Sequence, residues 1–508
     1  MNWCNRAMEI SQLWLLCATL AVSLLYYASN RRRCVGGRRC PPGPMPLPFI
    51  GNLHNLRGHR PPTLASLARI YGPVMMLKMG LTTTVVISSG DAAREAFTKH
   101  DRHLAARTVL DVARSLGFAD RSMIWLPSYD PVWKTLRGIA AANIFSPRSL
   151  AALRGVRESK VRDLVSYFRG RAGEEVDVRH AVYGTMLSLV SSSFFSVDVV
   201  NLSAESENEF RQSMTFLMEV VSKTNVSDLF PFLRALDLQG WRRTTEKYMG
   251  RVISFLDDVI DRRLAEADGA ASKHRDFLDS LLELVSAGKI ARDNVTIILL
   301  DVFLAGSDTI TATVEWAMAE LLRNPSEMAK ARSEVHGALG GRESVEEPDI
   351  ARLPYIQAVV KEAMRLHPAA PLLLPHRAVE DGVEVGGYAV PKGSMVIFNA
   401  WAIMRDPAAW ERPGEFMPER FLARAEEVDF WGKTFEFIPF GSGRRVCAGL
   451  PMAERVVPFM LASLLHAFEW RLPDGVSAEE LDMSHKFTVA NFRTVPLKAV
   501  PTLIRSVS

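Results

Sequence analysis

The chain has 508 residues, of which 48% are hydrophobic and 23% are charged. This composition excludes a disordered protein, a collagen and a small disulfide-stapled domain. The formal net charge is +4, but residues 1–40 contain six arginines and one acid, so the rest of the chain is nearly neutral. Because a nucleic-acid-binding protein normally has a basic patch on its folded body, nucleic acid is not an expected partner.

An apolar stretch over residues 10–28 has no charged residue and is long enough to cross a bilayer as a helix. Arginines 31–33 follow it directly and should stay on the cytoplasmic side. A cleaved signal peptide is the alternative, but its positive charges should precede the apolar stretch. We therefore expect a single-pass membrane anchor over 1–28.

Residues 29–51 are basic and rich in proline, with five prolines between positions 41 and 48. Proline has no backbone donor and restricts the residue before it, so this segment is expected to be a stiff, extended hinge. One folded domain should then span 52–508. It contains a single cysteine, Cys447, whereas the other four lie within residues 1–40, which favours a reducing, cytosolic location for the domain.

Apolar residues recur with the helical period, so the domain is expected to be mainly α with a small β portion. The predicted helices are 61–70, 146–168, 204–222, 245–265, 275–288 and, with the strongest pattern, 294–323. The predicted strands are 74–78, 84–88, 383–390 and 395–398. The middle of the longest helix, 297–310, is apolar nearly all round and should be buried.

Residues 305–309, Ala-Gly-Ser-Asp-Thr, interrupt that buried helix. A glycine in a helix interior costs about 1 kcal/mol, and buried polar groups need partners. One interpretation is a kink at which Thr309 bonds back to a carbonyl. The other is a notch in which Ala305 and Gly306 make room for a flat ligand, while Asp308 and Thr309 transfer protons.

Two further motifs carry polar residues in fixed spacing. Glu362 and Arg365 lie on one face of a helix that should end at His367, before a proline. A glycine-rich loop over 440–449 runs into an apolar helix near 450–466 and places Cys447 near its N-terminus, which favours a thiolate. A phosphate-binding loop, a nucleophilic cysteine and a plain buried cysteine are the alternatives, although the Walker lysine pattern is absent.

Together these motifs resemble the cytochrome P450 family of haem-thiolate monooxygenases, in the family's order and over essentially the whole chain. Phe440, Gly443, Arg445, Cys447 and Gly449 match its cysteine-loop signature F-x-x-G-x-R-x-C-x-G at every fixed position. Its other motifs are matched by Ala305, Gly306, Asp308 and Thr309, by Glu362 and Arg365, by Pro418-Glu419-Arg420-Phe421, and by Trp133 and Arg137. The anchor and hinge look like those of members in the endoplasmic reticulum.

The resemblance implies a P450 fold behind a membrane anchor and a haem b whose iron is bound by the Cys447 thiolate. Arg445, Arg137 and Trp133 would hold the haem propionates, and either His376 or the adjacent Arg377 would be a third partner. Thr309 would hold the oxygen species by a hydrogen bond, and Asp308 would relay protons from solvent. Glu362, Arg365 and Arg420 would form a buried ionic network with a folding role.

Three segments should line the substrate pocket in this resemblance, and they are almost wholly apolar. They are 369–375, the central-helix residues Leu300, Phe303, Leu304 and Ala305, and the turn over 487–492. An apolar substrate with few polar groups is therefore expected. The sequence looks most like plant geraniol-hydroxylase-like enzymes, and among them like grass members that oxidise labdane-related diterpenes for defence. A monoterpenol is the alternative substrate.

The implied partners are O2 and a membrane-anchored reductase that supplies electrons from NADPH. Basic residues near the cysteine loop, such as Lys433 and Arg444, could meet an acidic face of that flavoprotein. The location would be the endoplasmic-reticulum membrane. The rival classes are a haem-thiolate isomerase or dehydratase, a non-catalytic haem-binding protein, and a cysteine hydrolase that works without haem.

Overall fold

The computed structural model describes residues 39–56, 60–199, 209–267, 276–424 and 428–504, together with positions 14, 17 and 21. The predicted anchor over 1–28 lies outside the described residues apart from those three positions. It therefore stays a prediction. The predicted hinge is described from residue 39 onward.

Helices make up most of the described chain, as the sequence predicts. Their bounds are α2 Arg60–Tyr71, α3 Gly90–Lys99, α4 Asp101–Leu104, α5 Pro131–Ile139, α6 Pro147–Ala152, α7 Arg154–Arg169, α8 Val178–Phe195, α9 Glu209–Val220, α10 Val226–Leu229, α11 Trp241–Ala267, α12 Phe277–Ser286, α13 Arg292–Arg323, α14 Pro325–Leu339, α15 Pro354–Leu366, α16 Ala400–Ile403, α17 Glu419–Ala423 and α18 Leu450–Ala467. Short 3-10 turns include η3 Val112–Asp120, η5 Pro231–Leu236 and η7 Gly443–Arg445.

The largest sheet has the strand order β1-β2-β8-β5-β3. Its strands are β1 Val74–Met79, β2 Thr82–Ile87, β3 Ala106–Arg107, β5 His376–Arg377 and β8 Met395–Phe398. β2 and β8 pair in parallel, whereas the other neighbours are antiparallel. The smaller sheets contain β4 Val176–Asp177, β6 Val383–Val385, β7 Tyr388–Val390, β9 Phe468–Arg471, β10 His485–Phe487, β11 Asn491–Arg493 and β12 Lys498–Leu503.

Two predicted elements are interrupted. The strand predicted over 383–390 is the hairpin of β6 and β7, because Gly386 and Gly387 take φ values of +59° and +77°, which turn the chain back. The helix predicted over 146–168 is two helices, α6 and α7, which are separated at Leu153. The remaining predicted helices and strands that fall on described residues are present, with shifted ends.

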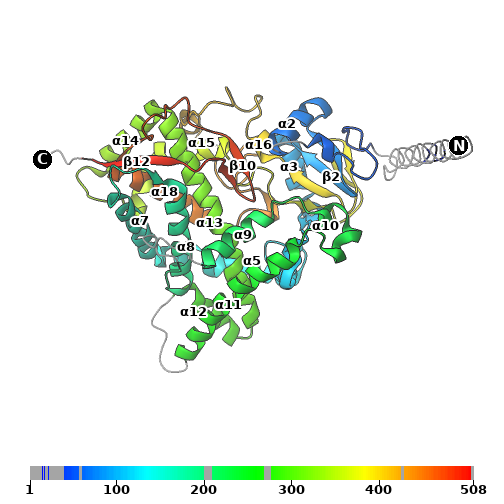
Figure 1. The fold of residues 1–508 in the computed structure, drawn as a ribbon, viewed down its shortest axis with the longest axis horizontal. Helices are drawn as coiled ribbons and strands as arrows, with labels where there is room; N and C mark the ends of the chain where they lie inside the picture. The colour runs from blue at the N-terminus through cyan, green and yellow to red at the C-terminus, as the bar shows by residue number, and fades with distance from the viewer. Residues whose placement is uncertain are drawn as a thin grey trace, which may run out of the picture.

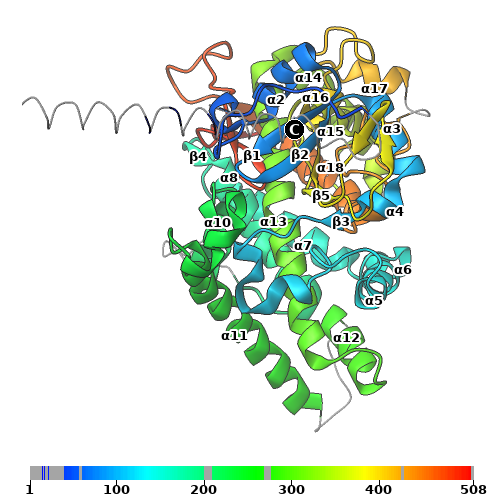
Figure 2. The same ribbon diagram turned by 90° about the vertical axis from the view of Figure 1, so that its right-hand side faces the viewer.

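Helix α13 runs through the middle of the molecule, between the sheet region and the helices that include α7, α14 and α18 (Figure 1). The view turned by 90° shows α11 and α12 reaching away from the sheet region beyond it (Figure 2). Among the described residues, α13 alone is long and apolar enough to cross a membrane, but 78% of its most apolar window is buried inside the protein. It is therefore the central helix of the core, as predicted.

The described part of the proline-rich segment packs on β1 of the largest sheet and on β7 of a smaller one. Met76 of β1 donates its backbone N–H to the Pro42 carbonyl at 2.8 Å, and Ala389 donates to the Arg39 carbonyl at 2.9 Å. A side chain at Gly43 would place its Cβ 2.0 Å from the Met76 carbonyl oxygen, so glycine is needed for this approach. Residues 39–51 are thereby held on the domain.

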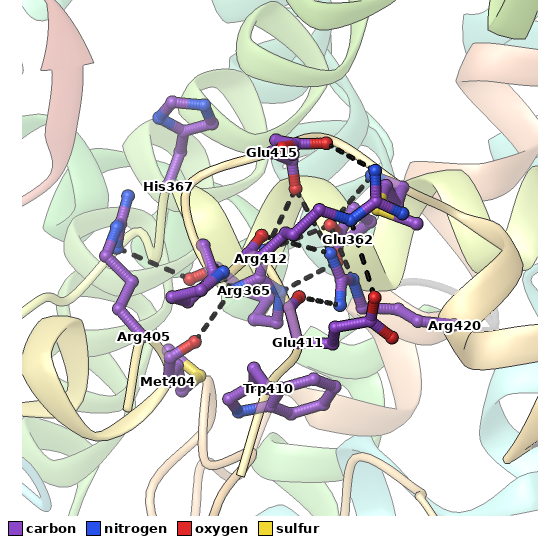
Figure 3. Close-up of polar contacts among 12 residues, drawn as sticks. Glu362, Arg365, His367, Met404, Arg405, Trp410, Glu411, Arg412, Glu415 and Arg420 are labelled. Atoms are coloured by element: carbon purple, nitrogen blue, oxygen red, sulfur yellow. Dashed lines mark hydrogen bonds and ion pairs between the residues drawn. The ribbon is translucent and has the colours of Figure 1, made fainter. Parts of the chain in front are cut away.

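A buried ionic network joins α15 to the loop around α17. Glu362 and Arg365 are both fully buried and pair at 2.7 and 2.9 Å, and the Arg420 guanidinium donates to Glu362 at 3.0 Å (Figure 3). Arg365 also donates to the carbonyls of Met404 and Pro413 at 2.9 Å each. Every charge is therefore paired, and the network fixes α15 against the segment that leads to the cysteine loop.

Candidate active site

The cysteine loop is held in shape by its backbone. The Cys447 amide donates to the Phe440 carbonyl at 3.0 Å, and α18 begins at Leu450, three residues after the cysteine. Gly443 has a φ of +65°, and a Cβ there would lie 2.5 Å from a carboxylate oxygen of Asp101. Gly443 is exposed and does not line the cavity, so its contribution is the turn itself.

The Cys447 thiol opens onto an interior cavity of about 700 Å³. Burial raises the pKa of this thiol, while the backbone N–H groups of Gly449 and Leu450 and the nearby Arg137 guanidinium lower it. A metal ion or a further cationic partner would be needed to favour the thiolate over the thiol, because burial is the largest of these effects.

Helix α13 forms another wall of the same cavity. Ala305, Gly306 and Thr309 line it, and the Thr309 hydroxyl donates to the Ala305 carbonyl at 2.8 Å. The expected substrate-facing residues Leu300 and Phe303 do not line it; both are buried, and Phe303 packs against Phe195 and Phe210. The expectation was therefore wrong for Leu300 and Phe303 and right for Leu304 and Ala305, while Asp301 and Val302 line the cavity as well.

Asp308 lies beside Thr309 in the chain but outside the cavity lining. Burial raises the pKa of its carboxyl to about 7, with Glu219 adding to the rise and Arg179 opposing it. Arg179 in turn donates to Glu315 at 2.8 Å. The expectation that both residues of the acid–threonine pair face the cavity therefore holds for Thr309 alone.

Three guanidinium groups meet at the cavity wall, those of Arg107, Arg137 and Arg445. Arg445 donates to the carbonyls of Ala105, Met123 and Leu126 and lies 4.8 Å from the centre of the Trp133 ring. Arg137 donates to the Val446 carbonyl.

Arg107 donates to the Leu374 carbonyl at 2.7 Å, and its buried Nε has no partner. Within the described ranges none of the three pairs with a carboxylate. Burial, with mutual repulsion added, lowers the pKa of Arg107 well below its usual range and that of Arg445 to about 10.

His376 and Arg377 point to opposite sides of β5. His376 is buried and lines the cavity, whereas Arg377 is exposed. The His376 Nδ1 lies 2.9 Å from the Leu104 carbonyl oxygen, which can only accept, so Nδ1 carries the proton. Burial and the cations Arg107 and Arg445 keep the pKa of His376 well below its usual range. A neutral ring with Nδ1 so engaged has no proton to offer a carboxylate, and Arg107, its partner across β3 and β5, is the better donor.

Trp133 and Phe440 both line the cavity. The Trp133 indole N–H is already donated to the Met123 carbonyl at 3.1 Å. Trp133 therefore contributes through its ring, against Arg445, more than through its N–H. Gly449 lines the cavity next to Cys447, and a Cβ there would lie 3.9 Å from the sulfur.

The family model for cytochrome P450 matches residues 41–494. The chain belongs to the cytochrome P450 family. It is 64% identical to "Cytochrome P450 76M5" of Oryza sativa subsp. japonica, over 98% of this chain and 100% of the relative. It is 61% identical to "Oryzalexin D synthase" and 60% identical to "Ent-cassadiene C11-alpha-hydroxylase 1" of the same organism, each over 98% of this chain and 100% of the relative.

A solved zebrafish cytochrome P450, crystallised with progesterone, has the same fold. Its TM-score is 0.75 at 24% identity, and the match covers 88% of this chain and 100% of that chain. The fold class predicted from sequence, mainly α with a small β portion, is thereby confirmed for the described domain. The chain is a haem-thiolate monooxygenase of this family, a type that receives its electrons from a redox partner and is typically bound to the endoplasmic reticulum.

The cavity fits a haem on its own chemistry. A thiol faces the interior, and backbone N–H groups point at its sulfur. Among the described residues, no carboxylate pairs with the half-buried guanidinium groups of Arg107, Arg137 and Arg445, and the Arg107 Nε–H has no acceptor, as expected for residues that bind the carboxylates of a prosthetic group.

Two residues of this site were missed from the sequence. Arg107 lies in a two-residue strand without a recognisable motif. Asp301 was visible as the single charged residue between Ile297 and Ala305, inside an otherwise apolar run, and that interruption was the available signal.

Proposed function

We propose that this chain is a membrane-anchored monooxygenase that hydroxylates a labdane-related diterpene olefin in plant defence metabolism. The reaction inserts one atom of O2 into a C–H bond and reduces the other to water, using two electrons and two protons. The observation that carries the proposal is one apolar cavity shared by the Cys447 thiol and the Thr309 hydroxyl.

The diterpene assignment is supported by the relatives and by the cavity lining. Two relatives bear names from oryzalexin synthesis and from hydroxylation of ent-cassadiene, which are diterpene chemistry. Residues 369–375 all line the cavity, and none of them has a polar side chain. A volume of about 700 Å³ is in the range of pockets that enclose ligands of drug size.

The haem, when bound, supplies the oxygen-activating iron, and the chain's residues hold it. Cys447 would bind its iron through the sulfur, with the N–H groups of Gly449 and Leu450 stabilising the negative charge there. Arg445, Arg137 and Arg107 would bind the propionates, with Trp133 and His376 packing beside them. The small residues Ala305 and Gly306, with Phe440 and Gly449 of the cysteine loop, would leave room for the ring.

Thr309 and Asp308 would share proton delivery. The Thr309 hydroxyl lines the cavity, and by turning its proton from the Ala305 carbonyl it would donate a hydrogen bond to the reacting oxygen. Asp308, buried behind it between Arg179 and Glu219, has its pKa raised to about 7, so it can both hold and release a proton near neutral pH.

Electrons would come from NADPH through a membrane-anchored reductase. We further propose that residues 1–28 anchor the chain in the endoplasmic-reticulum membrane, that 29–51 connect the anchor to the catalytic domain over 52–508, and that this domain lies in the cytosol. The positive residues that follow the apolar stretch support this orientation.

The first experiment is a reduced, CO-bound difference spectrum on membranes that contain the full chain, followed by turnover with reductase. A strongly red-shifted Soret band that Cys447→Ala abolishes would establish thiolate ligation. Diterpene olefins and monoterpenols are then offered side by side, with NADPH omitted as the control. Hydroxylated diterpenes support the proposal, whereas exclusive turnover of monoterpenols, or activity without NADPH, contradicts it.

A further inference from the structure

Asp301 is a buried acidic residue in the wall of the mainly apolar cavity. It lies on α13, one turn before Ala305, and only 2% of its surface is exposed. Nothing in the oxygen chemistry described above uses it. Burying an ionisable group costs free energy unless its polar atoms have partners. The contacts of Asp301 therefore indicate its role.

The carboxylate holds the start of a turn in the loop that precedes α5. The Ser122 hydroxyl donates to one oxygen of Asp301 at 2.5 Å, and the Met123 backbone N–H donates to the other at 2.8 Å. Ser122 then accepts the Ile124 N–H at 3.0 Å. One side chain of the central helix therefore satisfies the polar groups of a tight turn formed by residues 122–124.

The same turn is attached on its other side to the residues that surround the cysteine loop. The Met123 carbonyl accepts the Trp133 indole N–H at 3.1 Å and an Arg445 N–H at 3.2 Å. Met123 is thus fixed through its N–H to α13 and through its carbonyl to the haem-side residues. A shift of this turn would change the distance between the cavity wall and the reacting centre.

Met123 and Ile124 themselves line the cavity. The chain before them is irregular: within η3, Leu116 and Gly117 both take positive φ values, of +51° and +66°. This part of the wall has no sheet or long helix of its own to set its position. Its position is set by hydrogen bonds, and those to Asp301 are the ones that tie it to the central helix.

We propose that Asp301 is a positioning residue that sets the regioselectivity of hydroxylation by fixing Met123 and Ile124 in the cavity wall. This inference rests on the proposed monooxygenase function but not on the identity of the terpenoid. Both carboxylate oxygens of Asp301 already accept hydrogen bonds from the loop. Asp301 would therefore affect the position of the substrate through the loop and not by direct contact.

The test uses four single variants of the full-length, haem-loaded protein and the double variant that combines Asp301→Leu with Ser122→Ala. Asp301→Leu removes both contacts. Asp301→Asn keeps an acceptor for Met123 and is the conservative variant. Ser122→Ala removes one contact from the loop side. Glu320→Gln is the matched control, because Glu320 lies on the same helix, is also buried with a pKa raised to about 7, and contacts His367 instead of the loop.

We expect Asp301→Leu to change the ratio of product regioisomers by about tenfold, the order of magnitude for the loss of a buried hydrogen bond. Asp301→Asn and Ser122→Ala should have smaller effects, and the effect of Ser122→Ala should vanish in the Asp301→Leu background. Hydrogen exchange at the amides of Met123 and Ile124 should accelerate in Asp301→Leu and not in Glu320→Gln. The CO-bound spectrum should keep its thiolate band in all four.

An unchanged product ratio in a correctly loaded Asp301→Leu overturns the proposal. It is also overturned if Asp301 variants change the ratio while Ser122→Ala and the amide exchange do not respond, because Asp301 then acts on the substrate directly. If Asp301→Leu does not fold, Asp301→Asn and Ser122→Ala decide by the same readouts. Amide exchange needs no turnover, so it still tests the contact between Asp301 and the loop if no diterpene is accepted.

Discussion

Asp308 and Thr309 are adjacent in the chain, yet only Thr309 reaches the cavity, while Asp308 is buried on another face of α13, where it interacts with Arg179 and Glu219. Successive helical residues differ by about 100° in direction, so this separation is the ordinary consequence of their spacing. Thr309 is thereby placed to form a hydrogen bond at the reaction centre, and Asp308 is placed to supply protons from a buried site behind it.

Replacing Thr309 by Ala should uncouple the reaction. The variant keeps the helix, since the hydroxyl bonds only to the Ala305 carbonyl, but it loses the hydroxyl at the cavity. We expect NADPH consumption to continue, product per NADPH to fall by about tenfold or more, and peroxide release to rise accordingly. Thr309→Ser, which retains a hydroxyl, is the control and should recover most of the coupling. Full coupling in Thr309→Ala would remove Thr309 from proton delivery.

Asp308→Asn should abolish a pH dependence that the wild-type protein shows near neutrality. The Asp308 carboxyl has its pKa raised to about 7 and so holds its proton below that pH. Coupling in the wild type should decline as pH rises through about 7, whereas Asp308→Asn should be poorly coupled at every pH between 6 and 8.5. Product and NADPH are measured together across this range. The same inflection in both proteins would show that another group supplies the proton.

The pKa of Asp308 also predicts how stability changes with pH. The native carboxyl keeps its proton up to about pH 7, whereas the unfolded one releases it near 3.8. Between these values the native state binds more protons, so this group makes the protein less stable as pH rises from about 4 to 7. Thermal unfolding of Asp308→Asn should therefore depend less on pH in that window than unfolding of the wild type. A steeper dependence in the variant would contradict the raised pKa.

The sequence predicted motifs well and helical faces poorly. The cysteine loop and the pair of Glu362 and Arg365 were predictable because their residue types and spacing are themselves the signal. Leu300 and Phe303 were assigned to the cavity wrongly. When a helix is apolar nearly all round, the pattern of apolar residues does not show which of its faces points to the cavity.

Helix α8 was missed for the same reason. Nearly all of its residues are buried, so it has no polar face and no helical period in its apolar residues. Arg107 could not be assigned because its partners, the Leu374 carbonyl and the neighbouring Arg445, come from distant parts of the chain. The face of β5 that bears His376 and not Arg377 became clear only from the pairing of that short strand with β8 and β3.

Glu362→Gln should destabilise the fold without altering the chemistry directly. Glu362 is fully buried, and it accepts from two guanidinium groups and from the Met417 N–H. Removing one partner of such a network leaves an uncompensated buried charge and costs about 3–5 kcal/mol. We expect a lower melting temperature and less haem-loaded protein, measured by denaturation and by the CO-bound spectrum. Arg412→Gln, at an exposed ion pair with Glu415, is the control and should change stability by less than about 1 kcal/mol.

Arg107→Met should stabilise the haem-free protein but weaken haem retention in the haem-loaded protein. In the haem-free protein, Arg107 is a buried cation repelled by Arg445 and Arg137, with an unpartnered Nε, so its removal should stabilise that form. In the loaded protein the same cation would neutralise a propionate, so the variant should lose haem faster. Unfolding of the haem-free protein and the rate of haem transfer to an acceptor globin measure the two effects. Arg377→Met, on the exposed side of β5, is the matched control and should change neither. If Arg107→Met destabilises both forms alike, Arg107 has a packing role and the propionate assignment is wrong.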